Sequence, residues 1–382
     1  MNMKLKIGLE KLEEILGGGI DSNSTVLILT DTMVDKASFA QYVLSNRIAD
    51  EDAGIYLAST KTPKQVINNM EDHGWLAKDL IFVDGLSYSL KEESDAKYLL
   101  KENITDIKKS WPKFCELFER AVKETDGFKF VVFDSLETFM GLGAKEIAKK
   151  LKEWKGLAEK TKSTCLFLFT DWGYKKSEIE TIMKSVDLVI NLGTIEKKLI
   201  WMNYFCVGNS PKIFYSVTPT SIGIYVPKIL VTGPFHAGKS SIIHLLSEKA
   251  VSVDRLGTTI ALDHGYIEKK GVICDIFGTP GQERFDWILK ILSKDTWGII
   301  LVVDSTAPES FPRAMKMLET VKSYGIEFIV FANKQDLPGA LSPKEIAKKL
   351  GISEKDVVGT SVVTKKGFEE GLKALFDKIF KV

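Results

Sequence analysis

Eight residues at positions 233–240 combine the side-chain types that hold a nucleotide phosphate. They read GPFHAGKS, which fits the pattern G-x-x-x-x-G-K-[ST], and they follow the apolar run KILVT. In such a loop, Gly233 and Gly238 let backbone N–H groups curl around phosphate oxygens, while Lys239 reaches the terminal phosphates. The hydroxyl of Ser240 is a ligand for Mg²⁺, and the helix that follows adds its positive dipole. The other positions predicted to line the nucleotide are Phe235, His236, Ala237 and Ser241.

A second string, NKQD at positions 333–336, predicts which base the nucleotide carries. The carboxylate of Asp336 can accept two hydrogen bonds from the N1–H and exocyclic amine of guanine, a donor pair that adenine lacks. A buried carboxylate without partners costs on the order of 1–3 kcal/mol, so we expect a strong preference for guanine. Asn333 is expected to bond the base edge and Lys334 to lie along the ring. The backbone N–H groups of a last loop, at Ser361 and Val362, are expected to contact the base carbonyl.

These two strings predict GTP and GDP, with Mg²⁺, as the cofactors.

An earlier stretch, LTDTMVDKASFAQ at positions 29–41, keeps the lysine of a phosphate loop without its glycines. Aligned on Lys36, the two glycine positions hold Thr30 and Asp35, and Ala37 stands where a Mg²⁺-binding hydroxyl is needed. Asp31 and Asp35 also place negative charge where phosphate would lie. We therefore predict a site that has lost its nucleotide.

Strand and helix signals alternate along the chain. Nine short apolar runs predict strands: TVLIL, GIYLAS, LIFVDG, FKFVVFDS and TCLFLFT in the first half, then KILVTG, GVICDIFG, WGIILVVDS and EFIVFANK. Longer helical patterns separate them, which is typical of parallel sheets with crossover helices. We predict an α/β fold of two P-loop NTPase-type domains, each a mainly parallel sheet flanked by helices. The boundary is placed near Pro227, giving domains 1–227 and 228–382.

Composition narrows the classes of partner. The net charge of +1 gives no support for a broad electrostatic footprint on nucleic acid or anionic lipid. No apolar run reaches the roughly 18 residues that a spanning helix needs, and no signal peptide or lipid-attachment motif is evident. We expect a cytoplasmic protein without a membrane anchor. The four cysteines are far apart in sequence and are expected to be reduced core thiols.

With these strings in place, residues 228–382 resemble Ras-like small GTPases. GIILVVDST and VFANKQDLPGAL are similar to the Arf branch, and GPFHAGKSS resembles prokaryotic GTPases of the gliding-motility type. The resemblance implies that Thr259, with Thr258 as the alternative, closes over Mg²⁺ and the γ-phosphate. In FGTPGQERF it implies that Gly281 bonds the γ-phosphate through its N–H and that Gln282 orients the attacking water.

One string departs from the family pattern. Aligning D-x-x-G on Gln282 puts Gly278 in the place of the aspartate, whereas Asp275 fits the pattern three residues earlier. We favour the glutamine alignment because TPGQERF is the longer match, and we keep Asp275 as an alternative metal ligand. Arg255 is at a spacing reminiscent of the built-in arginine of heterotrimeric G-protein α subunits, and an ordinary solvated arginine is the alternative.

The first half resembles RecA-superfamily ATPases of the KaiC type. IGLEKLEEILGGGIDSNSTVLILTD is similar to their opening segment, and FKFVVFDSLETF places Asp134 where such folds hold Mg²⁺ through water. Thr60 and Lys61 stand where that family usually has the acidic residues that activate water. Together with the lost glycines, this predicts a pseudo-ATPase in which Lys36 and Asp134 are structural.

The function predicted is a GTP-controlled molecular switch that hydrolyses GTP slowly, with the KaiC-like domain as scaffold or output. The resemblance implies an activating or exchange protein as partner, because relatives often work with small roadblock-type or other regulators. Two alternatives remain: an ATPase that its GTPase domain regulates, and a non-catalytic assembly protein that nucleotide stabilises, since KaiC relatives often form rings.

Overall fold

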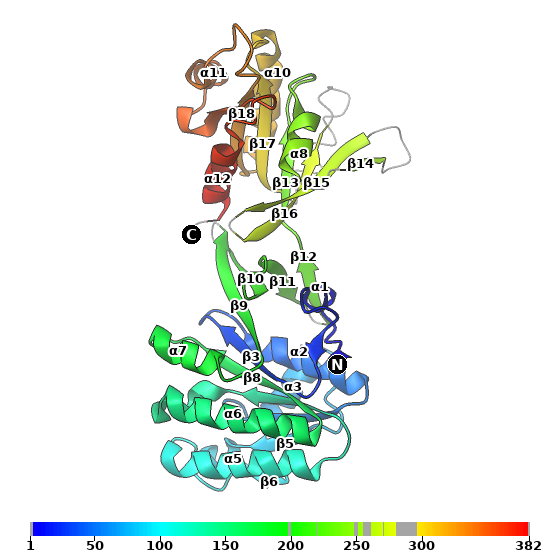
Figure 1. The fold of residues 1–382 in the computed structure, drawn as a ribbon, viewed down its shortest axis with the longest axis vertical. Coiled ribbons are helices and arrows are strands. Elements are labelled where there is room, and N and C mark those ends of the chain that lie inside the picture. The colour runs from blue at the N-terminus through cyan, green and yellow to red at the C-terminus, as the bar shows by residue number, and fades with distance from the viewer. Residues whose placement is uncertain are drawn as a thin grey trace. The chain divides into compact units, whose positions relative to one another are not determined.

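The structure is a computed structural model that describes residues 3–197, 200–218, 220–247, 251–254, 261–269, 271–279 and 296–380. The chain forms two compact units (Figure 1). The N-terminal unit comprises Met1–Thr194, Met202–Ser210 and Phe214–Ile224, and the C-terminal unit comprises Ile195–Trp201, Pro211–Ile213 and Tyr225–Val382. The exact boundary between positions 227 and 228 stays a prediction.

A ten-stranded sheet, in the order β12-β11-β10-β9-β3-β8-β7-β4-β5-β6, organises the N-terminal unit. Neighbouring strands are parallel from β9 to β6, that is, in the segment β9-β3-β8-β7-β4-β5-β6. The strands are β3 (Thr25–Thr30), β4 (Ala53–Ala58), β5 (Ile81–Asp84), β6 (Tyr98–Leu99), β7 (Lys129–Asp134), β8 (Ser163–Thr170), β9 (Leu188–Lys197), β10 (Ile200–Val207), β11 (Ile213–Val217) and β12 (Ile222–Tyr225). A short antiparallel pair, β1 (Lys4–Leu5) with β2 (Ile20–Asp21), precedes this sheet.

Helices cover both faces of this sheet. They are α1 (Glu10–Ile15), α2 (Lys36–Ala49), α3 (Pro63–Asp72), α4 (Ser87–Leu90), α5 (Ile107–Glu124), α6 (Ala144–Thr161) and α7 (Lys176–Met183), with the 3₁₀ helix η1 (Leu136–Leu142). In Figure 1, α5, α6 and α7 lie together along one side of the sheet. Trp154 of α6 stacks on Phe167 of β8 there, in one aromatic core with Phe133 of β7. Successive strand residues point to opposite faces, so Tyr56, the neighbour of core residue Leu57, lies on the α2 side.

The C-terminal unit is built on a seven-stranded sheet in the order β14-β15-β16-β13-β17-β18-β19. The pairs β14–β15 and β15–β16 are antiparallel and the remaining pairs are parallel. The strands are β13 (Lys228–Thr232), β14 (Val251–Asp254), β15 (Ala261–Lys269), β16 (Val272–Gly278), β17 (Thr296–Asp304), β18 (Glu327–Asn333) and β19 (Val357–Gly359). The helices are α8 (Lys239–Leu246), α10 (Phe311–Ser323), α11 (Pro343–Leu350) and α12 (Phe368–Ile379), with 3₁₀ turns η3 (Pro308–Ser310) and η4 (Glu354–Asp356).

Strand β13 is the topological centre of this second sheet. The chain continues on one side of β13 into β14, β15 and β16, and on the other side into β17, β18 and β19. In open α/β sheets, ligands bind at the carboxyl ends of the strands where the order reverses in this way. The fold therefore places the loop after Thr232 at the position expected for a ligand.

All nine predicted strands are confirmed, and so is the α/β class with mainly parallel sheets. Most of them are buried runs, as in β17, where every residue is buried, whereas buried and half-buried residues alternate in β16. The strands that were not predicted are β1, β2, β6, β9, β10, β11, β14, β15 and β19. Among the described residues, none of the helices combines the length and apolar character required to cross a bilayer.

Candidate nucleotide-binding site

The loop 233–240 begins at the carboxyl end of β13 and ends in the first turn of α8. Gly233 has φ 149°, and a Cβ there would lie 2.1 Å from the carbonyl oxygen of Val302 in β17. Gly238 caps α8 with φ 97°, and a Cβ there would lie 2.4 Å from Nδ2 of Asn333. Both contacts are shorter than any real Cβ contact, so both positions require glycine. The two glycines of the predicted pattern thus shape a tight backbone cradle.

Lys239 turns its side chain back over this cradle. Its Nζ donates hydrogen bonds to the carbonyl oxygens of Gly233 at 2.9 Å and Pro234 at 2.7 Å. Burial lowers the pKa of Lys239 to about 8, with the carboxylate of Asp263 acting in the opposite direction and Arg313 in the same direction. A partly desolvated ammonium at the centre of a loop is a strong attractor for an anion.

The other loop residues divide by burial. Ala237 is buried, whereas Ser240 and Ser241 are exposed at the start of α8. Phe235 is 58% exposed, and its ring contacts the ring of His236 with centroids 3.9 Å apart. His236 is also exposed and has φ 62°. These two side chains therefore face solvent on the outside of the loop.

The NKQD string is joined directly to the phosphate loop. Asn333, the last residue of β18, is buried and donates from Nδ2 to the carbonyl of Ala237 at 3.0 Å. Its Oδ1 is also buried and has no hydrogen-bond partner among the described residues. Lys334 forms an ion pair with Asp304 at 2.5 Å, and Asp336 is exposed at the tip of the loop. One side chain thus fixes the base loop against the phosphate loop.

The last loop closes on the same strand end. The N–H of Thr360 bonds the carbonyl of Ala332 at 2.9 Å, and the N–H of Gln335 bonds the carbonyl of Thr360 at 3.1 Å. Ser361 is buried, and its N–H donates to the carbonyl of Lys366 at 3.2 Å. Val362, the other predicted base contact, is half-buried beside it.

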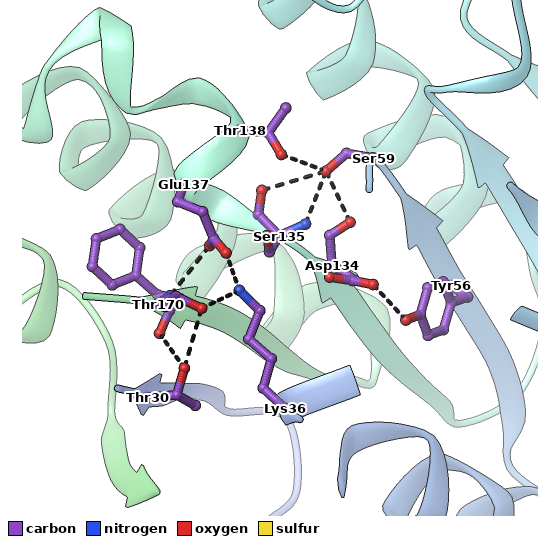
Figure 2. A network of polar contacts seen from close by, with 10 residues as sticks. Thr30, Lys36, Tyr56, Ser59, Asp134, Ser135, Glu137, Thr138 and Thr170 are labelled. Atoms are coloured by element: carbon purple, nitrogen blue, oxygen red, sulfur yellow. Dashed lines mark hydrogen bonds and ion pairs between the residues drawn. The ribbon is translucent and has the colours of Figure 1, made fainter. Parts of the chain in front are cut away.

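The N-terminal unit has a different arrangement at the corresponding loop, after β3 (Figure 2). Lys36 begins α2, and its Nζ forms an ion pair with Oε1 of Glu137 and a hydrogen bond of 2.6 Å with Oγ1 of Thr170. The side chains of Lys36 and Glu137 are only 12% and 13% exposed. Burial lowers the pKa of Lys36 to about 8, with the charge of Asp134 acting in the opposite direction. The positive charge of Lys36 is therefore balanced by the carboxylate of Glu137 within the protein.

The two aspartates of this loop are also engaged. Asp35 caps α2, accepting hydrogen bonds from the N–H of Ser38 at 3.1 Å and from its hydroxyl at 2.6 Å. Asp31 accepts from the N–H of Thr194 at 2.7 Å and from the N–H of Met33 at 2.9 Å. Carboxylates of the chain therefore occupy the helix start and the lysine, the two features that hold phosphate in a working loop.

Asp134 ends the neighbouring strand β7. It is buried and accepts a hydrogen bond from the hydroxyl of Tyr56 at 2.8 Å (Figure 2). Burial raises its pKa, against the hydrogen bond from Tyr56 and the charge of Lys36. Ser59 links the backbone on both sides of this residue, donating to the carbonyl of Asp134 and accepting from the N–H of Ser135, each at 2.8 Å. The carboxyl of Asp134 is therefore bonded within the protein, and its predicted structural role stays a prediction.

Comparisons with known proteins match both units. The model described as the ADP-ribosylation factor (Arf) family matches residues 225–379, and the model described as the ATPase KaiC matches residues 5–207, more than half of the chain. ADP-ribosylation factor-like protein 1 of Saccharomyces cerevisiae is 33% identical over 161 residues, which are 40% of this chain and 87% of that protein. Human ADP-ribosylation factor-like protein 4D is 30% identical over 166 residues, 40% of this chain and 83% of that protein. The chain belongs to both families.

Both predicted resemblances are therefore confirmed. Residues 5–207 form the KaiC domain and residues 225–379 form the Arf domain. A UPF0273 protein of Thermotoga maritima is also 33% identical over 144 residues, 36% of this chain and 57% of that protein. Membership of the Arf family implies that the Arf domain binds a guanine nucleotide. The loop predicted from the sequence to bind the phosphates is the one that Asn333 contacts through Ala237.

The two switch segments of the Arf domain lie mostly outside the described residues. Thr258, Thr259 and Arg255 fall there, as do Gly281 and Gln282. Their predicted roles stay predictions.

The strand that leads into the second switch is described, and it bears on the choice between Gly278 and Asp275. Gly278 pairs with Val231 near the end of β13, whereas Asp275 pairs with Lys228 at its start. Asp275 also lies 3.5 Å from Nε2 of His264. These positions favour the alignment on Gln282, with glycine in place of the family aspartate.

Asp263 of β15 is a residue that sequence reasoning missed. It is half-buried, and its charge acts on Lys239. A Cβ built on Gly278 would lie 3.4 Å from its Cβ and 3.5 Å from its Oδ2. Its position follows from the antiparallel register of β15 on β16, which the apolar pattern of an exposed hairpin does not reveal. The signal available was its place four residues after Thr259.

Proposed function

We propose that this protein is a GTP-dependent molecular switch. Its Arf domain binds GTP or GDP with Mg²⁺ and hydrolyses GTP, and its KaiC domain has lost ATP hydrolysis and serves as scaffold or output. The observation that carries the proposal is the hydrogen bond from Asn333 to Ala237, which holds the base-reading string against the phosphate loop beside Lys239. A nucleotide is the ligand that needs both elements at once.

The residues present fit a guanine nucleotide. Gly233 and Gly238 form a cradle that any Cβ would fill, as backbone binding of phosphate requires. The buried Oδ1 of Asn333 lacks a partner among the described residues, so the loop keeps an unused polar atom at its inner end, as a ligand site does before its ligand binds. Asp336 is exposed at the loop tip, where its carboxylate can accept the two guanine donors. Lys239 then moves its hydrogen bonds from loop carbonyls to phosphate oxygens.

The sequence assigns residues to the Mg²⁺ ion and to the water molecule that attacks the γ-phosphate. Ser240 at the start of α8 and Thr259 would hold Mg²⁺, which supplies positive charge against the phosphate oxygens when bound. Lys239 stabilises the same oxygens, the N–H of Gly281 bonds the γ-phosphate, and Gln282 orients the attacking water. The γ-phosphate orders the two switch segments, and hydrolysis releases them.

The pseudo-ATPase part of the proposal rests on the ion pair of Lys36 with Glu137. ATP would have to displace a buried carboxylate from the lysine and approach two further carboxylates, Asp31 and Asp35. Removing one partner of a buried ion pair costs about 3–5 kcal/mol, so the residues do not fit ATP with Mg²⁺.

The same proposal includes a cytoplasmic location, a roadblock-type or other regulator, and assembly into oligomers.

Two matched lysine variants of the full chain test which loop binds. Lys239→Ala removes a charge that contacts phosphate, and we expect GTP binding to weaken by about 2–5 kcal/mol, or roughly 30-fold to several thousand-fold in Kd. Lys36→Ala should leave GTP binding nearly unchanged. The measurement is titration with a fluorescent GTP analogue, with thermal unfolding as the check on folding.

Equal losses of GTP binding in the two folded variants would contradict this assignment. So would tight binding of a fluorescent ATP analogue that Lys36→Ala abolishes, since it would restore the ATPase alternative.

A further inference from the structure

Gly278 leaves the Arf domain without the carboxylate that the D-x-x-G pattern provides at the end of this strand. Mg²⁺ prefers oxygen ligands in near-octahedral geometry and is usually held through one or two carboxylates besides the phosphates. Ser240 and Thr259 supply hydroxyl groups only. A carboxylate from elsewhere in the domain would complete the set, and this inference rests on the proposed binding of GTP and GDP.

The strand ladder brings Asp263 to the side of Gly278. Strands β15 and β16 are antiparallel, with His264 opposite Phe277 and Gly265 opposite Ile276. Continuing this register by one step sets Asp263 opposite Gly278. The contact is close, because a Cβ on Gly278 would lie 3.4 Å from the Cβ of Asp263 and 3.5 Å from its Oδ2. The carboxylate of Asp263 therefore lies beside the backbone position that carries the aspartate in the family pattern.

The same carboxylate is near enough to the phosphate loop for its charge to act on Lys239. Among the charges that act on Lys239, that of Asp263 raises the pKa, in opposition to burial. At the base of the loop, Thr279, which follows Gly278, bonds the hydroxyl of Thr232 at 2.7 Å. The end of β16 and the start of the phosphate loop are thus held together, with Asp263 on the adjoining strand.

Asp275 does not meet these conditions. Successive residues of a strand point to opposite faces, so His264 faces away from the side that Asp263 occupies. His264 stacks on Phe277 with ring centroids 4.5 Å apart and lies 3.5 Å from Asp275. The pattern-matching aspartate is therefore on the opposite face of the sheet, three residues before the strand end.

We propose that Asp263 replaces the missing D-x-x-G aspartate and contributes its carboxylate, directly or through a bound water, to the Mg²⁺ beside Ser240. The ligand has moved from the end of one strand to the facing position on its antiparallel neighbour. Glycine at 278 fits the same arrangement, because a Cβ there would lie 2.7 Å from Cδ1 of Ile243 and would already be in van der Waals contact with Asp263.

This role has a consequence that a structural role lacks. A carboxylate near phosphate attracts the nucleotide when Mg²⁺ lies between them and repels it when Mg²⁺ is absent. Asp263→Asn should therefore weaken binding of GDP with Mg²⁺ while leaving Mg²⁺-free binding unchanged or tighter. A variant that merely damages the fold weakens both.

The test is a Mg²⁺ titration of the full chain at a fixed concentration of fluorescent GDP, read as the release rate of the nucleotide. We expect Asp263→Asn to raise the half-saturating Mg²⁺ concentration by roughly 10- to 100-fold, the usual effect of losing a carboxylate at a metal site. Asp275→Asn is the matched control, on the neighbouring strand and the opposite face, and should leave that concentration unchanged. Asp263→Glu provides the comparison if Asp263→Asn does not fold, since it keeps the charge and displaces it.

An unchanged Mg²⁺ midpoint in folded Asp263→Asn or Asp263→Glu, or an equal shift in Asp275→Asn, would overturn the assignment. Failure of the proposed function is a separate outcome: the unaltered protein would then bind no fluorescent GDP at any Mg²⁺ concentration. A normal wild-type titration with an unaffected variant rejects Asp263 alone.

Discussion

Lys36 and Lys239 begin the helices that follow the central strands of their domains, and they differ in what their ammonium groups contact. Lys239 bonds two backbone carbonyls, whereas Lys36 is paired with the carboxylate of Glu137. Burial lowers the pKa of each to about 8. Carbonyl dipoles can be exchanged for phosphate oxygens without exposing a new charge, but displacing Glu137 leaves a buried carboxylate unpaired. We therefore expect the lysine to be a ligand group in the Arf domain and a structural group in the KaiC domain.

The lowered pKa of Lys239 predicts a pH dependence of GTP affinity. Bound phosphate favours the charged lysine and raises its pKa, so binding takes up a proton once the pH exceeds the free-protein value of about 8. Affinity should therefore fall as pH rises, by about threefold between pH 7.5 and 8.5. Titrations with a fluorescent GTP analogue at both pH values measure this. Lys239→Arg is the control, because arginine stays charged, and an equal decline in that variant would assign the effect to another group.

At the scale of elements, the start of α8 is the junction of three segments. Gly238 caps the helix, Ala237 accepts from Asn333 of β18, and Gly233 lies against β17. A position with φ near +97° costs a residue with a Cβ about 1–2 kcal/mol, and here the Cβ would also collide with Asn333. The local geometry of one glycine thus controls both the phosphate loop and the base loop.

Gly238→Ala should consequently weaken GTP binding by at least tenfold as well as lower the free energy of unfolding by roughly 1–3 kcal/mol. Gly351→Ala is a matched control, because Gly351 caps α11 with φ 64° and a Cβ there meets nothing within 4 Å. That variant should lose about 1–2 kcal/mol of stability and keep its GTP affinity. Denaturant unfolding and nucleotide titration separate the two effects. Retained affinity in Gly238→Ala would show that the contact with Asn333 is not needed for binding.

Sequence reasoning reached the elements that local patterns encode. Most of the predicted strands are continuous apolar runs, and the glycines and lysine of the loop 233–240 stand at fixed spacing, so both could be predicted. The partner of Lys36 could not, because Glu137 is 101 residues away and meets it only through the packing of η1 against β8. Asp263 was missed for a similar reason, since its neighbour Gly278 is set by strand register.

In the molecule as a whole, two domains of related fold carry a lysine at the start of the corresponding helix, and the surroundings of the two lysines differ. The Arf domain keeps a glycine cradle around a lysine, and the KaiC domain fills the corresponding positions with its own carboxylates. We expect a bound nucleotide to stabilise the Arf domain, whereas contacts within the protein should stabilise the corresponding loop of the KaiC domain. This division of roles predicts one nucleotide site per chain.

Calorimetric titration of the nucleotide-free full chain, with Mg²⁺ present, counts the nucleotide sites of each chain. We predict that GDP and GTP each bind at one site per chain and that ATP gives no binding heat, because Glu137, Asp31 and Asp35 close the KaiC site. Binding of ATP at a site of its own, or the absence of guanine-nucleotide binding, would contradict the account.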